Sequence, residues 1–336
     1  MRRSANENQK QGKSKTDRRG ELSPEELRFI SDDFTQIDYS FDELIEVFIE
    51  DCDFRNLREH TLKFYRNELK ATRNLLSEQN LSLKAKDITG EIIKHNVIMF
   101  MRSKGIKTVS INSRLRALRA FFNLLEGQKI LVQNPMKEIK LLKDRRRIIE
   151  TFDKEQLRAL FKTCNLRTFI GLRDYTIMLL LLETGVRANE LIGIKTEDIM
   201  WSQKVIRITN AKGGYERFVP VQNIMIDQLK KYLKVRGSID TDYLFITQDD
   251  SPLSKKQMQD RIRLYGQEAK IKNVRCSPHT FRHTFAKMSV LGGCNAFILQ
   301  SILGHSSIEQ SRVYVNLFSN EVQENHSKFS PLNNLL

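Results

Sequence analysis

The chain has 336 residues, of which 40% are hydrophobic, so it is long enough to form about two domains with cores of their own. Its net charge of +15 favours a polyanionic partner, although charge alone does not separate DNA from RNA or from an anionic membrane surface. The apolar run at residues 177–182 is far too short to span a membrane, and the first 20 residues lack the apolar stretch of a secretory signal. We therefore expect a cytoplasmic protein without a membrane partner.

A basic and flexible tail is predicted at residues 1–37. Its first 20 residues carry seven Lys or Arg against two acids and almost nothing apolar, which is a composition typical of disorder. Such a run either solubilises the chain or lies along DNA. Within the tail, Ser23 and Glu26 form the capping-box pattern of a short helix that would run toward Ile30.

Residues 38–140 are predicted to form a helical domain. Apolar side chains recur there at helical spacing, which indicates helices near residues 41–52, 58–79, 88–103 and 108–127. The last helix also carries three basic side chains, Arg114, Arg116 and Arg119. These arginines either contact DNA phosphates or form a solvated basic face.

A charged linker is predicted at residues 141–150. It is a basic run, and it follows Pro135, which ends the preceding helical segment. The second domain, at residues 151–318, opens with a helix that Asp153 and Gln156 are expected to cap.

A buried helix and a hairpin are predicted next. The helix covers residues 170–182 and ends at Gly185, a residue type that adopts the left-handed conformation after a helix. Residues 205–208 and 217–221 have strand character, and a turn that contains glycine joins them into a hairpin. Pro220 indicates that the second strand lies at a sheet edge.

The rest of the second domain is expected to be mainly helical. Residues 243–246 add an extended segment, and helices are expected at residues 254–269, 279–290, 295–303 and 307–314. The predicted fold class is mainly α with a small antiparallel β-sheet, in two domains. Residues 319–336 form a tail with an apolar end, which either folds back on its own domain or docks on a partner.

A group of cationic and hydroxyl-bearing residues carries the chemistry of the second domain. His279 and Arg282 form a His-x-x-Arg motif, His305 ends a Leu-Gly-His motif, and Tyr314 comes nine residues later. Two further cations lie upstream, Arg187 and Lys212. Arginine forks bind phosphoryl oxygens, His and Lys move protons, and Tyr can form a covalent intermediate. The set predicts a site for a phosphate under attack.

In the order and spacing of these motifs, the chain resembles the tyrosine recombinases, also called phage integrases. The resemblance covers roughly residues 41–318 and is densest after Thr151, and several motifs in the right order are far more specific than one. It implies that residues 38–140 form a core DNA-binding domain and residues 151–318 a catalytic domain. It also implies that double-stranded DNA is cut and rejoined by four protomers on two sites.

The resemblance assigns a role to each residue of the site. Tyr314 attacks the scissile phosphorus and forms a 3′-phosphotyrosyl link, which conserves the bond energy so that no ATP is needed. Arg187 and Arg282 clamp the phosphate. Lys212 protonates the leaving 5′-oxygen, although Ala211 stands where a glycine is common before the lysine.

The two motif histidines flank the phosphate in this scheme. His279 accepts or relays the tyrosine proton, and His305 donates a hydrogen bond to a phosphoryl oxygen. His283 is expected only to buttress its helix. Glu190, one turn after Arg187, either orients the site through hydrogen bonds or is a plain surface glutamate.

No metal and no cofactor are expected. His279 and His283 have the i, i+4 spacing of a zinc pair but lack the intervening glutamate and a third ligand nearby. The four cysteines are scattered, without the paired spacing of a zinc site.

Other interpretations stay open at this point. A type IB topoisomerase or a telomere resolvase shares much of this residue set, and a catalytically silent DNA-binding regulator could keep the fold. The sequence does not separate service to a mobile element from resolution of replicons. It also leaves open the target site and any accessory DNA-bending or directionality proteins.

Overall fold

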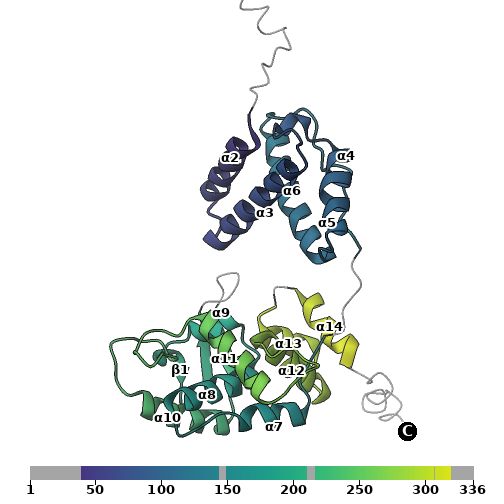
Figure 1. The fold of residues 1–336 in the computed structure, drawn as a ribbon. Helices are drawn as coiled ribbons and strands as arrows, with labels where there is room; N and C mark the ends of the chain where they lie inside the picture. Colours follow the sequence, from purple (N-terminus) through teal and green to yellow (C-terminus); the bar gives the residue numbers. More distant parts are fainter. Residues whose placement is uncertain (1–38, 144–148, 210–215, 306, 319–336) are drawn as a thin grey trace, which may run out of the picture. The chain divides into compact units, whose positions relative to one another are not determined.

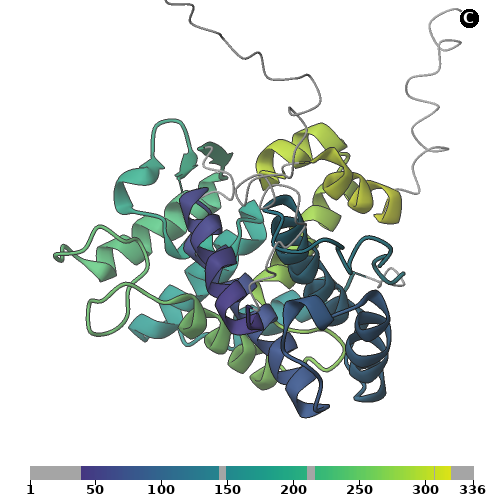
Figure 2. The same cartoon turned by 90° about the horizontal axis from the view of Figure 1, so that it is seen from above.

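The computed structural model describes residues 39–143, 149–209, 216–305 and 307–318 (Figures 1 and 2). The chain divides into two compact units, residues 1–146 and 147–336, each with its own core. Both predicted tails, with the short helix expected after Ser23, and the middle of the predicted linker lie outside the described residues. Within the described ranges, no helix is both long and apolar enough to cross a membrane.

The first unit is a helical bundle with an aromatic core. Its elements are α2 (Phe41–Phe54), α3 (Glu59–Glu78), η2 (Ala85–Asp87), α4 (Gly90–Ile92), η3 (Ile93–Met99), α5 (Phe100–Ser103) and α6 (Thr108–Gly127). Ser40 and Glu43 form a capping box that starts α2. Phe121 of α6 lies between Phe41 and Phe48 of α2, with ring centroids 5.1 and 5.7 Å apart. The four helical segments predicted for this unit are confirmed.

The third predicted helix departs from regular α geometry. Its central segment, η3, is a π-helix that continues α4 into α5. Gln79, just after α3, donates a 2.8 Å hydrogen bond to the backbone oxygen of Asn96 and accepts a 3.0 Å bond from its side-chain amide. The contact falls within the π-helical segment, a rare geometry that apolar periodicity does not predict.

The three arginines of α6 have different surroundings. Arg114 donates a 2.6 Å bond to Glu68 of α3, and Arg119 donates to the backbone oxygen of Ile139. Arg116 is exposed. Arg116 is therefore the most accessible of the three for either expected role, a phosphate contact or part of a solvated basic face.

The second unit is mainly helical with one small sheet. Its helices are α7 (Lys154–Lys162), α8 (Phe169–Thr184), α9 (Ala188–Ile192), α10 (Asn223–Arg236), α11 (Lys255–Glu268), α12 (Pro278–Leu291), α13 (Ala296–Leu303) and α14 (Ile308–Phe318). A 3₁₀ turn, η4 (Thr196–Asp198), leads into the sheet. Asp153 and Gln156 form the predicted capping box of α7. The helices expected in this domain are confirmed, with ends that differ by a few residues.

The sheet has three antiparallel strands in the order β1 (Ile199–Met200), β2 (Val205–Ile208), β3 (Arg217–Pro220). Ile206 faces Val219 across the predicted hairpin, and β3 lies at the edge as Pro220 indicated. The strand that completes the sheet beside the hairpin is β1. Residues 243–246 take part only in isolated bridges to Lys195 and Pro252. Phe245 and Ile246 are buried, so their apolar character reflects burial in the core.

Helix α8 forms the centre of this unit and leads into the candidate site. Its side chains are buried around most of its circumference, and α12 packs against it. Gly185 follows it with φ of +61°, and a Cβ there would lie 2.5 Å from the ring of Phe285. The chain therefore turns tightly against α12 directly before Arg187. Helices α12, α13 and α14 pack together beside this turn (Figures 1 and 2).

Candidate active site

Three arginines from different elements converge on the C-terminal end of α13. Arg217 donates a 2.9 Å bond to the backbone oxygen of Ile302, and Arg282 donates one of 2.9 Å to that of Leu303. Arg187 reaches the oxygens of Leu303 at 3.3 Å and Gly304 at 3.0 Å. The last carbonyls of a helix lack intrahelical partners and carry its negative dipole end, so α13 attracts this cluster.

One carboxylate pairs with two of the three arginines. Glu190 accepts 2.9 Å from Arg187 and, through both oxygens, 3.0 and 2.7 Å from Arg217. It is 2% exposed. Burial by itself would raise the pKa of Glu190, but the hydrogen bonds from Arg217 and Arg187 lower it below the ordinary 4.5. Glu190 is thus a buried, ionised residue and not a plain surface glutamate.

Arg282 is the most buried of the three cations. It is 4% exposed, and it also donates a 2.7 Å bond to the backbone oxygen of Gly185. Burial and the nearby Arg187 lower the pKa of Arg282 to about 10, so it stays charged at neutral pH. Three guanidinium groups around one carboxylate leave an excess of positive charge, which suits the binding of an anion such as a phosphate.

Tyr314 of α14 lies beside this cluster and is 5% exposed. Its hydroxyl is 2.7 Å from Nδ1 of His283, and its ring stacks on that of His305 with centroids 6.2 Å apart and planes 7° apart. Burial raises the pKa of Tyr314, against the lowering effect of Arg282 and Arg187. The hydroxyl is therefore protonated at neutral pH and needs a proton acceptor to become a nucleophile.

His305 is fixed by a residue that we did not single out in the sequence. Its Nδ1 lies 2.7 Å from the hydroxyl of Ser311, which is fully buried on α14. Burial, with Arg282 and Arg187, lowers the pKa of His305 to about 4, so the ring is neutral at pH 7. If Ser311 donates to Nδ1, the proton of the ring is on Nε2, the nitrogen left to donate to a ligand.

The geometry differs from the expectation for the other two histidines. We expected His279 to take the tyrosine proton and His283 to buttress the helix, whereas the structure brings His283 to the hydroxyl. His279 is exposed, and its ring packs on that of His283 at 6.2 Å between centroids. Partial desolvation and the nearby Arg282 lower the pKa of His279 below 6.5. One turn of helix separates the two rings, so spacing alone could not decide between them.

Lys212 lies outside the described residues, between β2 and β3. Of the other predicted site residues, Arg187, Glu190, Arg282, His305 and Tyr314 lie at one end of α13, and His279 lies one helical turn from His283. The sequence motifs assigned no site role to Arg217 or Ser311, and His283 was expected only to buttress its helix. Arg217 begins the strand after the lysine turn, and Ser311 shares a helix face with Tyr314 three residues later, so both carried a positional signal.

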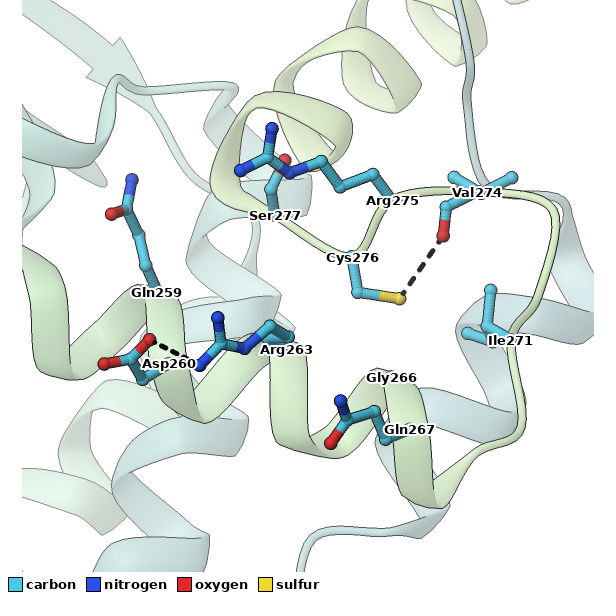
Figure 3. Close-up of a pocket in the computed structure, with 10 residues that line it drawn as sticks. All are labelled: Gln259, Asp260, Arg263, Gly266, Gln267, Ile271, Val274, Arg275, Cys276 and Ser277. Carbon is cyan, nitrogen blue, oxygen red and sulfur yellow. Dashed lines mark hydrogen bonds and ion pairs between the residues drawn. The ribbon is translucent and has the colours of Figure 1, made fainter.

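A separate pocket lies beside α11 and contains none of these residues (Figure 3). It has a volume of about 280 Å³ and is lined by polar and apolar residues, which include Arg263, Arg275 and Ile271. Arg263 is paired with Asp260 at 3.0 Å, and Cys276 closes over Gly266, where a Cβ would lie 2.3 Å from its sulfur. As for metals, the described ranges hold no group of three or more His, Cys, Asp or Glu able to bind an ion.

Comparisons with known proteins show the family of the chain. The sequence profile of the phage integrase family matches residues 150–321, and that of the phage integrase N-terminal SAM-like domain matches residues 45–129. The chain is 29% identical over 299 residues to tyrosine recombinase XerD of Shewanella oneidensis, covering 87% of this chain and 98% of that protein. It is 30% identical over 283 residues to a tyrosine recombinase of Pseudothermotoga lettingae, covering 84% and 94%.

Solved structures show the same fold. A lambda integrase dimer bound to a core site superposes with a TM-score of 0.71 at 17% identity, covering 90% of this chain and 83% of that one. The Tn1549 transposon integrase in complex with transposon right-end DNA gives 0.69 at 20% identity, covering 85% and 99%. At these identities the likeness supports the fold, and the family rests on the sequence matches.

Proposed function

The chain belongs to the phage integrase family and is a tyrosine-type DNA recombinase, and from this premise we propose that it recombines double-stranded DNA at specific sites through a 3′-phosphotyrosyl link on Tyr314. The observation that carries the proposal is the position of Tyr314. A buried tyrosine hydroxyl lies beside the cationic cluster of Arg187, Arg217 and Arg282, whose three positive charges exceed the one negative charge of Glu190. That arrangement provides a nucleophile and an anion site together.

The cationic cluster acts on the phosphate. Arg187 and Arg282 bind the non-bridging oxygens of the scissile phosphate, where charge builds as the pentacoordinate transition state forms. Both side chains are already held by backbone carbonyls of the α13 end and of Gly185, so little reorganisation is needed when DNA binds. His305 adds a hydrogen bond to a phosphoryl oxygen, as the family resemblance implies.

The chemistry is a transesterification that conserves atoms and charge. The bond between Tyr314 Oη and phosphorus forms as the bond from phosphorus to the 5′-oxygen breaks, and the phenolic proton leaves. Lys212 gives a proton to the 5′-oxygen in our proposal, and His279 is the residue that the resemblance assigns to the tyrosine proton. The 5′-hydroxyl of a second strand then reverses the step, with neither ATP nor a metal ion.

The assembly that we propose is a homotetramer on two DNA sites. The tail at residues 319–336 docks on a neighbouring protomer in this scheme, and accessory proteins bend the DNA or set the direction. The relatives named above include both XerD and a transposon integrase, so integration or excision of a mobile element and resolution of replicons both fit. We propose that the protein works in the cytoplasm, either in the integration and excision of a mobile element or in the resolution of replicons.

The proposal is tested by the Tyr314→Phe variant on a nicked suicide substrate. Because this change keeps the ring and removes the attacking oxygen, covalent protein–DNA adducts on a denaturing gel should vanish while DNA binding in a gel shift is retained. The same assay with wild-type protein in excess EDTA should still give adduct. A persistent adduct in the variant would show that another residue attacks, and a wild-type chain that binds without any adduct would indicate a silent regulator.

A further inference from the structure

We propose that His283 positions the Tyr314 hydroxyl and accepts its proton as the attack on phosphorus begins. The inference deepens the proposed function and rests on it, since Tyr314 must be the nucleophile. It differs from the role implied by the family resemblance, which gives this proton to His279.

The contact between His283 and Tyr314 joins two helices at the reacting atom. Nδ1 of His283 on α12 lies 2.7 Å from the hydroxyl oxygen, and the ring centroids are 5.8 Å apart. The distance of 2.7 Å between nitrogen and oxygen is the ordinary length of a hydrogen bond. Tyr314 is almost fully buried, so bulk water competes little with the imidazole for the hydroxyl proton.

The position of His283 is fixed by its neighbours on α12. Ser277 and Pro278 start this helix, and the adjacent Arg282 is anchored to Gly185 and Leu303. Thr284 donates a 2.8 Å bond back to Thr280 and accepts one of 2.9 Å from the backbone of Phe152. A base that is held this firmly presents one nitrogen to the hydroxyl, which is the pre-organisation that proton transfer requires.

The protonation state agrees with an acceptor role. Burial, with His279 and Arg282 nearby, lowers the pKa of His283 to about 4. The ring is therefore neutral at pH 7, and with its proton on Nε2 the Nδ1 atom accepts a hydrogen bond from the tyrosine. An anionic phosphate bound beside the ring favours the imidazolium form, so DNA binding strengthens the base when it is needed.

His279 has surroundings that suit a different task. It is exposed and packs on His283, so DNA can reach it directly. In the proposed step the Tyr314 O–P bond forms, the bond from phosphorus to the 5′-oxygen breaks, and the phenolic proton moves to Nδ1 of His283. The leaving oxygen is protonated separately, by Lys212 in the proposed function. When the second strand attacks, the proton returns from His283 to the tyrosine.

The test compares His283→Ala, His283→Asn and His279→Ala in single-turnover cleavage of a suicide substrate at saturating protein. Each variant is made with natural tyrosine at position 314 and with a ring-fluorinated tyrosine, whose more acidic phenol needs less help from a base. We expect His283→Ala to cleave about 100-fold more slowly with DNA affinity unchanged. His283→Asn, whose side-chain oxygen lies near the position of Nδ1, should lose less. Fluorination should shrink the His283→Ala loss and leave any His279→Ala loss unchanged.

Three results would overturn the inference while leaving the proposed function intact. The first is cleavage by His283→Ala at the wild-type rate. The second is a loss of rate in His283→Ala that is equal with natural and with fluorinated tyrosine. The third is a loss of rate that fluorination reduces in His279→Ala and not in His283→Ala. A wild-type chain that forms no adduct would contradict the proposed function instead. In that case the unfolding midpoints of His283→Ala, Tyr314→Phe and the double variant still test the contact, because additive shifts would mean that the two side chains do not interact.

Discussion

At the scale of single residues, Ser311 is a fully buried side chain whose contact with His305 leads to a prediction about the site. Its buried hydroxyl is the partner of Nδ1 in His305. Removing one partner of a buried hydrogen bond costs about 1–3 kcal/mol, and an unpaired Nδ1 allows the ring to take the other tautomer. We expect Ser311→Ala to slow single-turnover cleavage about tenfold or more, with DNA affinity in a gel shift unchanged.

The matched control for this prediction is Ser307→Ala. Ser307 is exposed at the start of the same helix, where its hydroxyl accepts a 3.3 Å bond from the backbone of Glu309. Loss of such a weak, solvated contact should leave the cleavage rate close to that of the wild type. Equal rates for Ser311→Ala and the wild type would mean that the tautomer of His305 does not limit the reaction.

Arg116 and Arg114 give a second contrast at this scale. Arg116 is exposed, whereas Arg114 is half-buried and paired with Glu68. If α6 faces DNA, Arg116→Ala should weaken binding and reduce the slope of log affinity against log salt by about 0.9, the value for one phosphate contact. Arg114→Ala should instead lower the unfolding midpoint and leave the slope unchanged. A slope that is insensitive to Arg116 would show that this helix faces away from the duplex.

At the scale of elements, the C-terminal end of α13 binds three arginines, which come from the N-cap of α9, from β3 and from α12, and Glu190 pairs with the first two. Glu190→Gln keeps the shape of the side chain but removes the charge that neutralises two of them. Breaking a buried ion pair costs about 3–5 kcal/mol, so the thermal midpoint of the second unit should fall by roughly 10 °C. Glu197→Gln is the control, because Glu197 is exposed and 3.8 Å from its partner Arg207, and such a pair contributes little.

The ion pairs of Glu190 with its two arginines also predict how stability responds to pH. The folded pKa of Glu190 is lower than its ordinary value of 4.5, so its stabilising effect is fully present above pH 4.5 and is lost as the pH falls through the folded pKa. The midpoint difference between wild type and Glu190→Gln should therefore be largest at neutral pH and shrink in acid. Identical midpoints at pH 7 would show that the carboxylate contributes nothing to stability.

The elements also show what a sequence can and cannot reveal. Apolar periodicity predicted α2, α8 and α12 because each buries a continuous face or most of its surface. It predicted the helix that contains η3 but not its π geometry, and it did not predict β1, which is only two residues long. Gln79 bonds the backbone of η3, and β1 pairs with β2, so both features involve contacts with other segments that local spacing does not record.

At the scale of the whole molecule, the same limit applies to the site. The motifs identified Arg187, Arg282, His305 and Tyr314 from their order along the chain. They did not reveal that α13 offers its last carbonyls to the arginines, because that needs segments more than 100 residues apart to meet. They also could not choose between His279 and His283, since the choice depends on how α14 packs on α12.

The division of this basic chain into two units leads to the last prediction. Each unit has a core of its own, so residues 1–146 and 147–336 can be prepared as separate fragments. If both contact the same duplex, their phosphate contacts add, and the salt slope of the full chain should equal the sum of the two fragment slopes. For about 6–10 contacts, affinity falls roughly 10³–10⁵-fold between 50 and 200 mM salt.

The linked chain should also bind more tightly than either fragment, because the first contact raises the effective concentration of the second unit. Fluorescence anisotropy on one recombination site measures all three slopes. A fragment whose affinity does not change with salt would show that its unit does not contact the DNA backbone.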